Sequence, residues 1–97
     1  MLSLGRFEFA QNLGSTTVHY NGLLVGILDC DIVTLLTQGK YTATTARILN
    51  TLALVWNVPV SFYRQNGQFV MSYTGKVFTF KNRVFLNRHT GEIFTID

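Results

Sequence analysis

The segment 40–57, KYTATTARILNTLALVWN, decides the fold, because its apolar residues recur with the spacing of an amphipathic helix. Thr42 or Thr44 can cap its start by accepting a hydrogen bond from a backbone N–H. Pro59 ends it, because proline cannot continue the hydrogen-bond ladder and its predecessor avoids the helical conformation. We therefore predict one helix over about 43–57, which packs its apolar stripe against a sheet. That stripe comprises Thr45, Ile48, Leu49, Leu52, Val55 and Trp56.

Two Asn-Gly dipeptides, at 21–22 and 66–67, predict a tight β-hairpin on each side of this helix. Asparagine and glycine tolerate the positive φ angles of a type I′ turn, which closes a two-residue hairpin. Gly75 and Gly91 mark later turns. The predicted fold class is α+β, with antiparallel sheets of two β-hairpin blocks and one central helix packed on them. We expect strands over 6–9, 16–20, 23–27, 32–36, 60–64, 68–73, 76–80, 83–86 and 92–96.

Size and composition indicate a single domain over 1–97. Ninety-seven residues suffice for one core, and 47% of them are hydrophobic, which excludes intrinsic disorder. Charged residues make up 13%, about half of the usual share. Because so little charge is available to cover the surface, we expect some apolar surface to be hidden in a homo-oligomer or by a partner.

The chain shows no pattern for export or membrane insertion. Residues 1–11 lack the basic and apolar regions of a signal peptide, and the uncharged run 48–63 is too short and polar to span a bilayer. The single cysteine, Cys30, rules out an internal disulfide and fits a reducing compartment. We expect a cytoplasmic protein without membrane contact.

The net charge of +3 is unevenly distributed along the chain. Residues 1–39 carry one basic against three acidic side chains, a net charge of −2, whereas residues 40–97 carry seven against two, a net charge of +5. The basic half can attract nucleic acid, nucleotides or an acidic protein. Ordinary solubility charge along strand edges explains the same distribution, so that alternative stays open.

The start of the helix is the clearest candidate for a binding site. A helix N-terminus presents unpaired backbone N–H groups and partial positive charge, which favour an anion. Three hydroxyls and two basic side chains gather there, and further basic residues follow on the predicted strands. The candidate ligand-binding residues are Lys40, Thr42, Thr44, Thr45, Arg47, Arg64, Lys76 and Arg83.

The last strands provide a second pattern, in which basic and aromatic residues alternate. By strand alternation Lys76, Phe78 and Phe80 share one face, and Arg83 lies with Phe85 on the next strand. Such a face can stack bases and pair phosphates. The competing interpretation places the phenylalanines in the core and the charges at strand ends.

Signals for catalysis or metal binding are poor. His19 and His89 lack a ligand or carboxylate at motif spacing, and no cysteine–histidine cluster suits zinc. Asp29 and Asp31 flank Cys30 and disfavour a negatively charged thiolate, so this triplet is interpreted as a turn. A phosphate-binding loop of the GxxxxGK[ST] type is also missing. We therefore expect no enzyme, no metal and no cofactor.

The segments 42–50 (TATTARILN), 60–69 (VSFYRQNGQF) and 75–80 (GKVFTF) resemble small accessory proteins encoded by tailed bacteriophages. The shared features are threonines that open a basic helix, a tyrosine-containing hairpin and a Gly-Lys strand. Ala46 departs from the pattern, because a second basic residue is usual there. The resemblance, over roughly residues 16–80, implies a phage origin and a host-cytoplasm setting, and no settled activity.

Two functions remain open on this basis. The first is a non-enzymatic phage-type accessory protein that captures an anionic ligand, either a nucleotide-type defence signal or nucleic acid. The second is an oligomeric interaction module that inhibits a host protein. In that case an aromatic interface would form from Tyr63, Phe69 and Tyr73.

Overall fold

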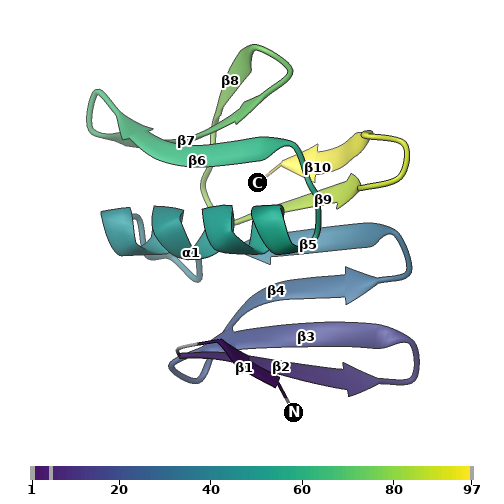
Figure 1. Ribbon diagram of the computed structural model, residues 1–97. Helices are drawn as coiled ribbons and strands as arrows, with labels where there is room; N and C mark the ends of the chain where they lie inside the picture. Colours follow the sequence, from purple (N-terminus) through teal and green to yellow (C-terminus); the bar gives the residue numbers. More distant parts are fainter. Residues whose placement is uncertain (1, 5, 97) are drawn as a thin grey trace.

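The computed structural model describes residues 2–4 and 6–96, and its two antiparallel sheets with one helix confirm the α+β prediction (Figure 1). In chain order the elements are β1 (Leu2–Leu4), β2 (Phe7–Asn12), β3 (Ser15–Tyr20), β4 (Leu23–Asp29), β5 (Ile32–Leu36), α1 (Ala43–Val55), β6 (Val60–Gln65), β7 (Gln68–Tyr73), β8 (Lys76–Thr79), β9 (Arg83–Asn87) and β10 (Ile93–Ile96).

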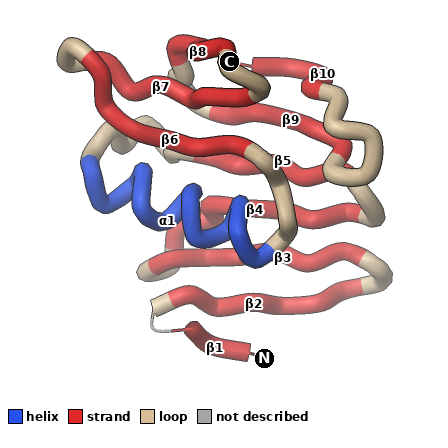
Figure 2. Tube along the Cα trace, turned by 45° about the horizontal axis from the view of Figure 1, so that its top comes forward, coloured by secondary structure: helices blue, strands red, loops and turns tan. Residues whose placement is uncertain are grey.

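The larger sheet joins the two β-blocks. Its strand order is β1-β2-β3-β4-β5-β9-β10, and all neighbours are antiparallel, so β5 of the first block pairs directly with β9 of the second. The smaller sheet has the order β6-β7-β8. Figure 2 shows α1 and the smaller sheet on one side of the larger sheet. The hydrophobic core lies between these two layers.

The predicted elements lie close to the observed ones, with two differences. β1 is not among the predicted strands, because a segment of three residues is too short to show alternation. The helix ends at Val55 instead of 57, since Trp56 is its C-cap and Asn57 adopts a φ of 57°. A residue in this left-handed conformation ends a helix.

Both Asn-Gly turns have the predicted backbone conformation. Asn21 and Gly22 have φ angles of 51° and 82°, and Asn66 and Gly67 have angles of 52° and 79°. Positive φ at both central residues matches the right-handed twist of the flanking strands. These turns therefore set the registers of the β3–β4 and β6–β7 hairpins.

Thr42, one of the two caps predicted from the sequence, caps α1. Its side-chain oxygen accepts a hydrogen bond from the N–H of Thr45 at 3.1 Å. The buried face of α1 includes Ile48, Leu49 and Leu52, while Val55 of the predicted stripe is 48% exposed. Within the described part of the chain, no helix has the length and apolarity needed to cross a membrane.

Gly26 allows α1 to pack closely on β4. A Cβ atom at this position would lie 2.8 Å from Cδ1 of Leu52 and 3.0 Å from the ring of Trp56. Next to it, the β3–β4 register shifts between Val18 and His19. The irregularity places both Val25 and Gly26 toward the buried side, where the helix passes.

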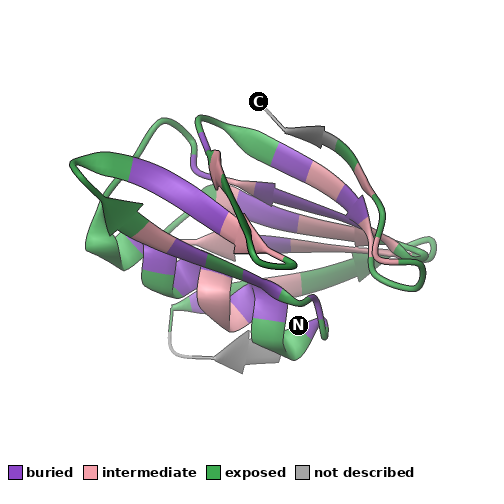
Figure 3. Cartoon of the chain, turned by 90° about the horizontal axis from the view of Figure 1, so that it is seen from above, coloured by how far each residue is buried: buried purple, intermediate pink, exposed green. Residues whose placement is uncertain are grey.

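Aromatic side chains fill the core beneath the smaller sheet. The ring centroid of Phe62 lies 5.1 Å from that of Phe80 and 6.3 Å from that of Phe69. Phe80 is therefore a core residue, whereas Phe78 and Phe85 are partly exposed. Figure 3 shows the buried residues, in purple, on α1 and on strands of both sheets.

Candidate functional site

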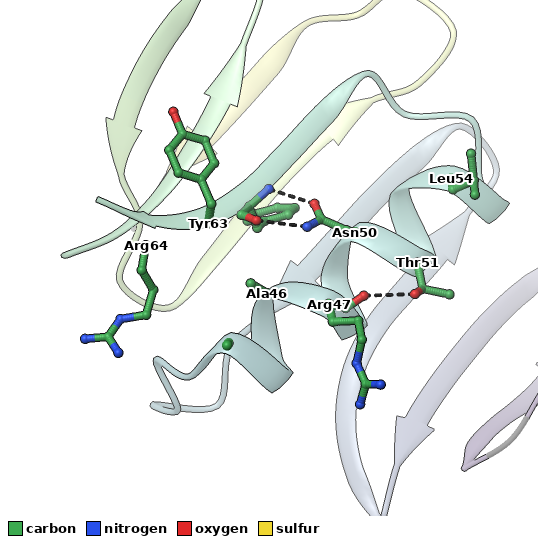
Figure 4. A pocket seen from close by; sticks show the side chains of 9 residues that line it. Ala46, Arg47, Asn50, Thr51, Leu54, Tyr63 and Arg64 are labelled. Atoms are coloured by element: carbon green, nitrogen blue, oxygen red, sulfur yellow. Dashed lines mark hydrogen bonds between the residues drawn. The ribbon is translucent and has the colours of Figure 1, made fainter. Parts of the chain in front are cut away.

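An open groove of about 520 Å³ runs between α1 and β6 (Figure 4). Its walls come from consecutive turns of the helix and from the strand that lies beside the helix. The residues that line it are Ala43, Ala46, Arg47, Asn50, Thr51, Leu54, Phe62, Tyr63 and Arg64.

Asn50 joins the two walls. Its Nδ2 donates a hydrogen bond to the carbonyl oxygen of Phe62 at 2.8 Å, and the N–H of Phe62 donates to Asn50 Oδ1 at 2.7 Å. The amide thus occupies the edge of β6 as a neighbouring strand would. On the N-terminal side of Asn50 the helix carries the small side chains of Ala43 and Ala46, which leave space between helix and strand.

Arg64 presents backbone groups to the same groove. Its cross-strand partner Phe69 accepts a hydrogen bond from the N–H of Phe80 at 2.9 Å, so the polar backbone groups of Phe69 face β8. Opposite residues of such an antiparallel pair direct their backbone groups to opposite sides. The N–H and carbonyl of Arg64 therefore face the edge next to α1, like those of Phe62.

Two guanidinium groups flank the groove. Figure 4 shows Arg47 extending from α1 and Arg64 extending from β6. Both side chains are exposed, and within residues 2–4 and 6–96 neither forms an ion pair. A guanidinium presents a planar fork of donors that matches phosphate or carboxylate oxygens. The groove therefore combines an apolar floor with two cationic groups that have not been neutralised by the protein.

Tyr63 precedes Arg64 on β6, and its side chain points away from that of Arg64, as alternation along a strand requires. Its ring is half-buried. We therefore expect an aromatic ring of a ligand in the groove to contact the arginines and the alanines more than Tyr63.

The helix start forms a second, smaller cavity of about 310 Å³. Lys40, Thr42, Thr44 and Thr45 line it, together with residues of the β3–β4 turn. Two of the three predicted hydroxyls form hydrogen bonds within the protein. The Thr42 and Thr45 hydroxyls lie 3.2 Å apart, and the Thr42 hydroxyl also caps the helix. Thr45 is only 6% exposed, so little of its side chain is open to a ligand.

The eight candidate ligand residues lie in four places instead of one. Lys40 and the threonines share the smaller cavity, and Arg47 and Arg64 share the groove. Lys76 begins β8, and Arg83 begins β9 in the larger sheet, with its guanidinium 5.4 Å from the Phe85 ring centroid. The basic residues that are separated in sequence are therefore only partly brought together by the fold.

The predicted aromatic interface is also divided. Phe69 is 5% exposed and packs against Phe62 and Phe80, so the expectation that it lies at a surface is wrong. The Tyr73 hydroxyl donates to the carbonyl oxygen of Gly91 and ties the smaller sheet to the β9–β10 turn. Only Tyr63 contributes to the groove.

Sequence reasoning did not identify Asn50 or the alanines as site residues. Asparagine is unfavourable inside a helix unless its amide has a specific partner, so Asn50 carries a usable signal. Ala43 and Ala46 carry none, because their effect depends on the strand that lies opposite.

The described residues contain no cluster of three or more histidine, cysteine or acidic side chains that could hold a metal ion. Cys30 lies exposed in the β4–β5 turn with a φ of 55°, as the turn interpretation of residues 29–31 requires. Comparison with protein-family models, curated proteins and solved structures finds no match. The function must therefore be inferred from the geometry of the site.

Proposed function

We propose that this protein is a non-enzymatic binding protein that captures an anionic ligand in the groove between α1 and β6. The pair Arg47 and Arg64 carries the proposal, because two exposed guanidinium groups flank one apolar groove and have no ion-pair partner among the described residues. An anionic ligand in the groove would offer these guanidinium groups an acceptor for charge-assisted hydrogen bonds.

The shape of the groove favours a phosphate-bearing small molecule with a flat apolar part. A volume of about 520 Å³ lies within the range of small-molecule sites, and its lining includes the apolar side chains of Ala43, Ala46 and Leu54. The Arg64 N–H adds a directional donor at the strand edge. A nucleotide combines these chemical features, with phosphates for the arginines and a base for the floor.

The resemblance to phage accessory proteins gives this activity a setting. In host cytoplasm, such a protein would sequester a nucleotide-type defence signal by stoichiometric capture, without turnover. The alternative, an aromatic surface that inhibits a host protein, is less well supported because Phe69 is buried.

Isothermal titration with mononucleotides, linear dinucleotides, cyclic dinucleotides and inorganic phosphate tests the proposal. We expect at least one nucleotide class to bind one site per chain, and Arg47→Ala and Arg64→Ala each to weaken binding by about tenfold or more. Lys76→Ala is the matched control, since Lys76 lies outside the groove. Binding that survives the double variant Arg47→Ala/Arg64→Ala would overturn the proposal, as would the absence of binding by the whole panel.

A short single-stranded oligonucleotide in the same titration separates nucleotide from nucleic acid. Neutralisation of many phosphates gives a steep decline of affinity with salt, whereas a small ligand held by two arginines gives a shallow one. We expect the shallow dependence.

A further inference from the structure

The hydrogen bonds of Asn50 show which kind of group fits the edge of β6 that faces α1. The Asn50 amide carries an acceptor, Oδ1, and a donor, Nδ2, on the same carbon atom. Oδ1 accepts from the N–H of Phe62 at 2.7 Å, and Nδ2 donates to the carbonyl of Phe62 at 2.8 Å. A planar group with an adjacent acceptor and donor therefore matches the N–H and carbonyl of one residue on this edge.

Arg64 presents the same pair of backbone groups two residues along the strand, about 7 Å from Phe62. Within residues 2–4 and 6–96, no side chain bonds to either group as Asn50 does to Phe62. Ala46 precedes Asn50 by four residues and so lies one helical turn away on the same face of α1. Figure 4 shows Ala46 and Arg64 on the same side of Asn50. A methyl group forms no hydrogen bond, so the backbone groups of Arg64 are left for a ligand.

The part of the edge that remains open is one residue long. The N–H of Val60 donates to the carbonyl of Val58 at 2.9 Å, and Asn50 occupies Phe62. The turn into β7 follows shortly after Arg64. A peptide that added a strand to this edge would need several outward-facing residues. The open part therefore suits a small planar group.

We propose that the nucleotide in the α1–β6 groove binds with the edge of its base on the backbone of Arg64, which rests on the function proposed above. The common nucleobases carry an adjacent acceptor and donor on their Watson–Crick edge, as a carboxamide does. The base would accept from the Arg64 N–H and donate to the Arg64 carbonyl. Its ring would extend toward Ala43 and Ala46, whose small side chains leave room, and its phosphate would lie where both guanidinium groups are exposed.

Titration with pairs of nucleotides that differ only in methylation of this edge tests the proposal. The pairs are guanosine monophosphate with its N1-methyl form, uridine monophosphate with its N3-methyl form and adenosine monophosphate with its N6,N6-dimethyl form. Methylation removes one hydrogen bond and obstructs the other, so we expect it to weaken binding by about tenfold or more, toward the affinity of ribose 5-phosphate. Arg64→Ala keeps the backbone, so it should weaken both members of a pair and preserve their ratio.

Hydrogen exchange of the backbone amides gives a readout on the protein itself. In the free protein the Arg64 N–H should exchange faster than those of Tyr63 and Gln65, which face β7. A saturating nucleotide should slow exchange at Arg64 by about tenfold or more. Unchanged exchange at Arg64 in the saturated complex would overturn the proposal.

Ala46→Asn places a second amide one turn before Asn50, where it can occupy the backbone groups of Arg64 itself. If circular dichroism shows that the variant is folded, we expect its nucleotide affinity to fall to that for ribose 5-phosphate. Val55→Asn is the matched control, since Val55 is 48% exposed on α1 and lies outside the groove. Wild-type affinity in folded Ala46→Asn protein would overturn the proposal, and the methylated pairs decide if this variant does not fold.

The outcomes separate this proposal from the function on which it rests. Absence of binding by every nucleotide would overturn both. Binding that depends on Arg47 and Arg64 but is unaffected by methylation of the base edge would overturn only the contact with the Arg64 backbone.

Discussion

Asn50 and Phe62 exchange two hydrogen bonds, of 2.8 Å and 2.7 Å, across the gap between α1 and the edge of β6. A side-chain amide thereby replaces the strand that would otherwise pair with this edge. An exposed strand edge invites pairing with other chains, and the contact with α1 removes part of that edge. The same contact sets the spacing of the two groove walls.

Asn50→Ala should therefore destabilise the fold more than an ordinary helix substitution. It removes two hydrogen bonds and leaves the N–H and carbonyl of Phe62 without their partners, which costs about 2–4 kcal/mol. Urea unfolding measures the loss. Thr51→Ala is the matched control, because its hydroxyl bonds only to the exposed Arg47 carbonyl and its removal should change stability by about 0.5 kcal/mol or less. Equal stability of the two variants would contradict this role.

Gly26→Ala should also destabilise the protein, by about 1–3 kcal/mol through overpacking. The added methyl group would meet Leu52 at 2.8 Å and Trp56 at 3.0 Å. Leu52→Val removes the nearer contact, so the double variant should lose less stability than the sum of the two single variants. Thermal unfolding of the wild type, the two single variants and the double variant gives the double-mutant cycle. Strictly additive losses of stability would show that the close approach of Gly26 to Leu52 is unimportant.

Thr42→Ala should lower stability by about 1 kcal/mol, because Thr42 caps α1 through Thr45. Thr44→Ala is its control, since Thr44 is exposed and has no cap bond. If the ligand binds in the α1–β6 groove, Thr42→Ala should leave ligand affinity within about twofold of wild type. A large loss of affinity without a loss of stability would instead indicate that the ligand binds at the start of α1.

Tyr73→Phe should cost about 1 kcal/mol, because the Tyr73 hydroxyl donates to the Gly91 carbonyl and links the two sheets. Tyr63→Phe removes the equivalent hydroxyl from β6. Among the described residues that hydroxyl has no such bond, so this variant should leave the free energy of unfolding unchanged. Chemical denaturation distinguishes them, and a neutral Tyr73→Phe would show that other contacts hold the β9–β10 turn in place.

Arg64→Lys separates charge from geometry in the groove. Lysine keeps the positive charge but loses the planar fork, so bidentate recognition predicts an affinity between those of wild type and Arg64→Ala. Calorimetric titration with the best nucleotide of the panel gives the three values. Wild-type affinity in Arg64→Lys would mean that the site uses charge alone.

The Arg47–Arg64 pair shows where prediction from sequence stops. Both residues are recognisable as basic residues near a helix, but their place on one groove depends on β6 lying beside α1. The prediction that Phe69 lies at a surface is wrong for the same reason. Alternation groups the residues of β7 into two faces but does not show which face the core covers. The helix cap at Thr42, in contrast, involves partners only three residues apart.

The sequence by itself determined the local conformations: the two Asn-Gly turns, the start of α1 at Thr42 and its end before Pro59. These depend on backbone preferences and hydrogen bonds over a few residues, which act whatever the rest of the chain does. Only the tertiary structure decided that β9 pairs with β5, that one sheet face stays uncovered and that two arginines flank one groove. Such features depend on contacts between distant segments, which form only when burial of the common core repays the ordering of the chain between them.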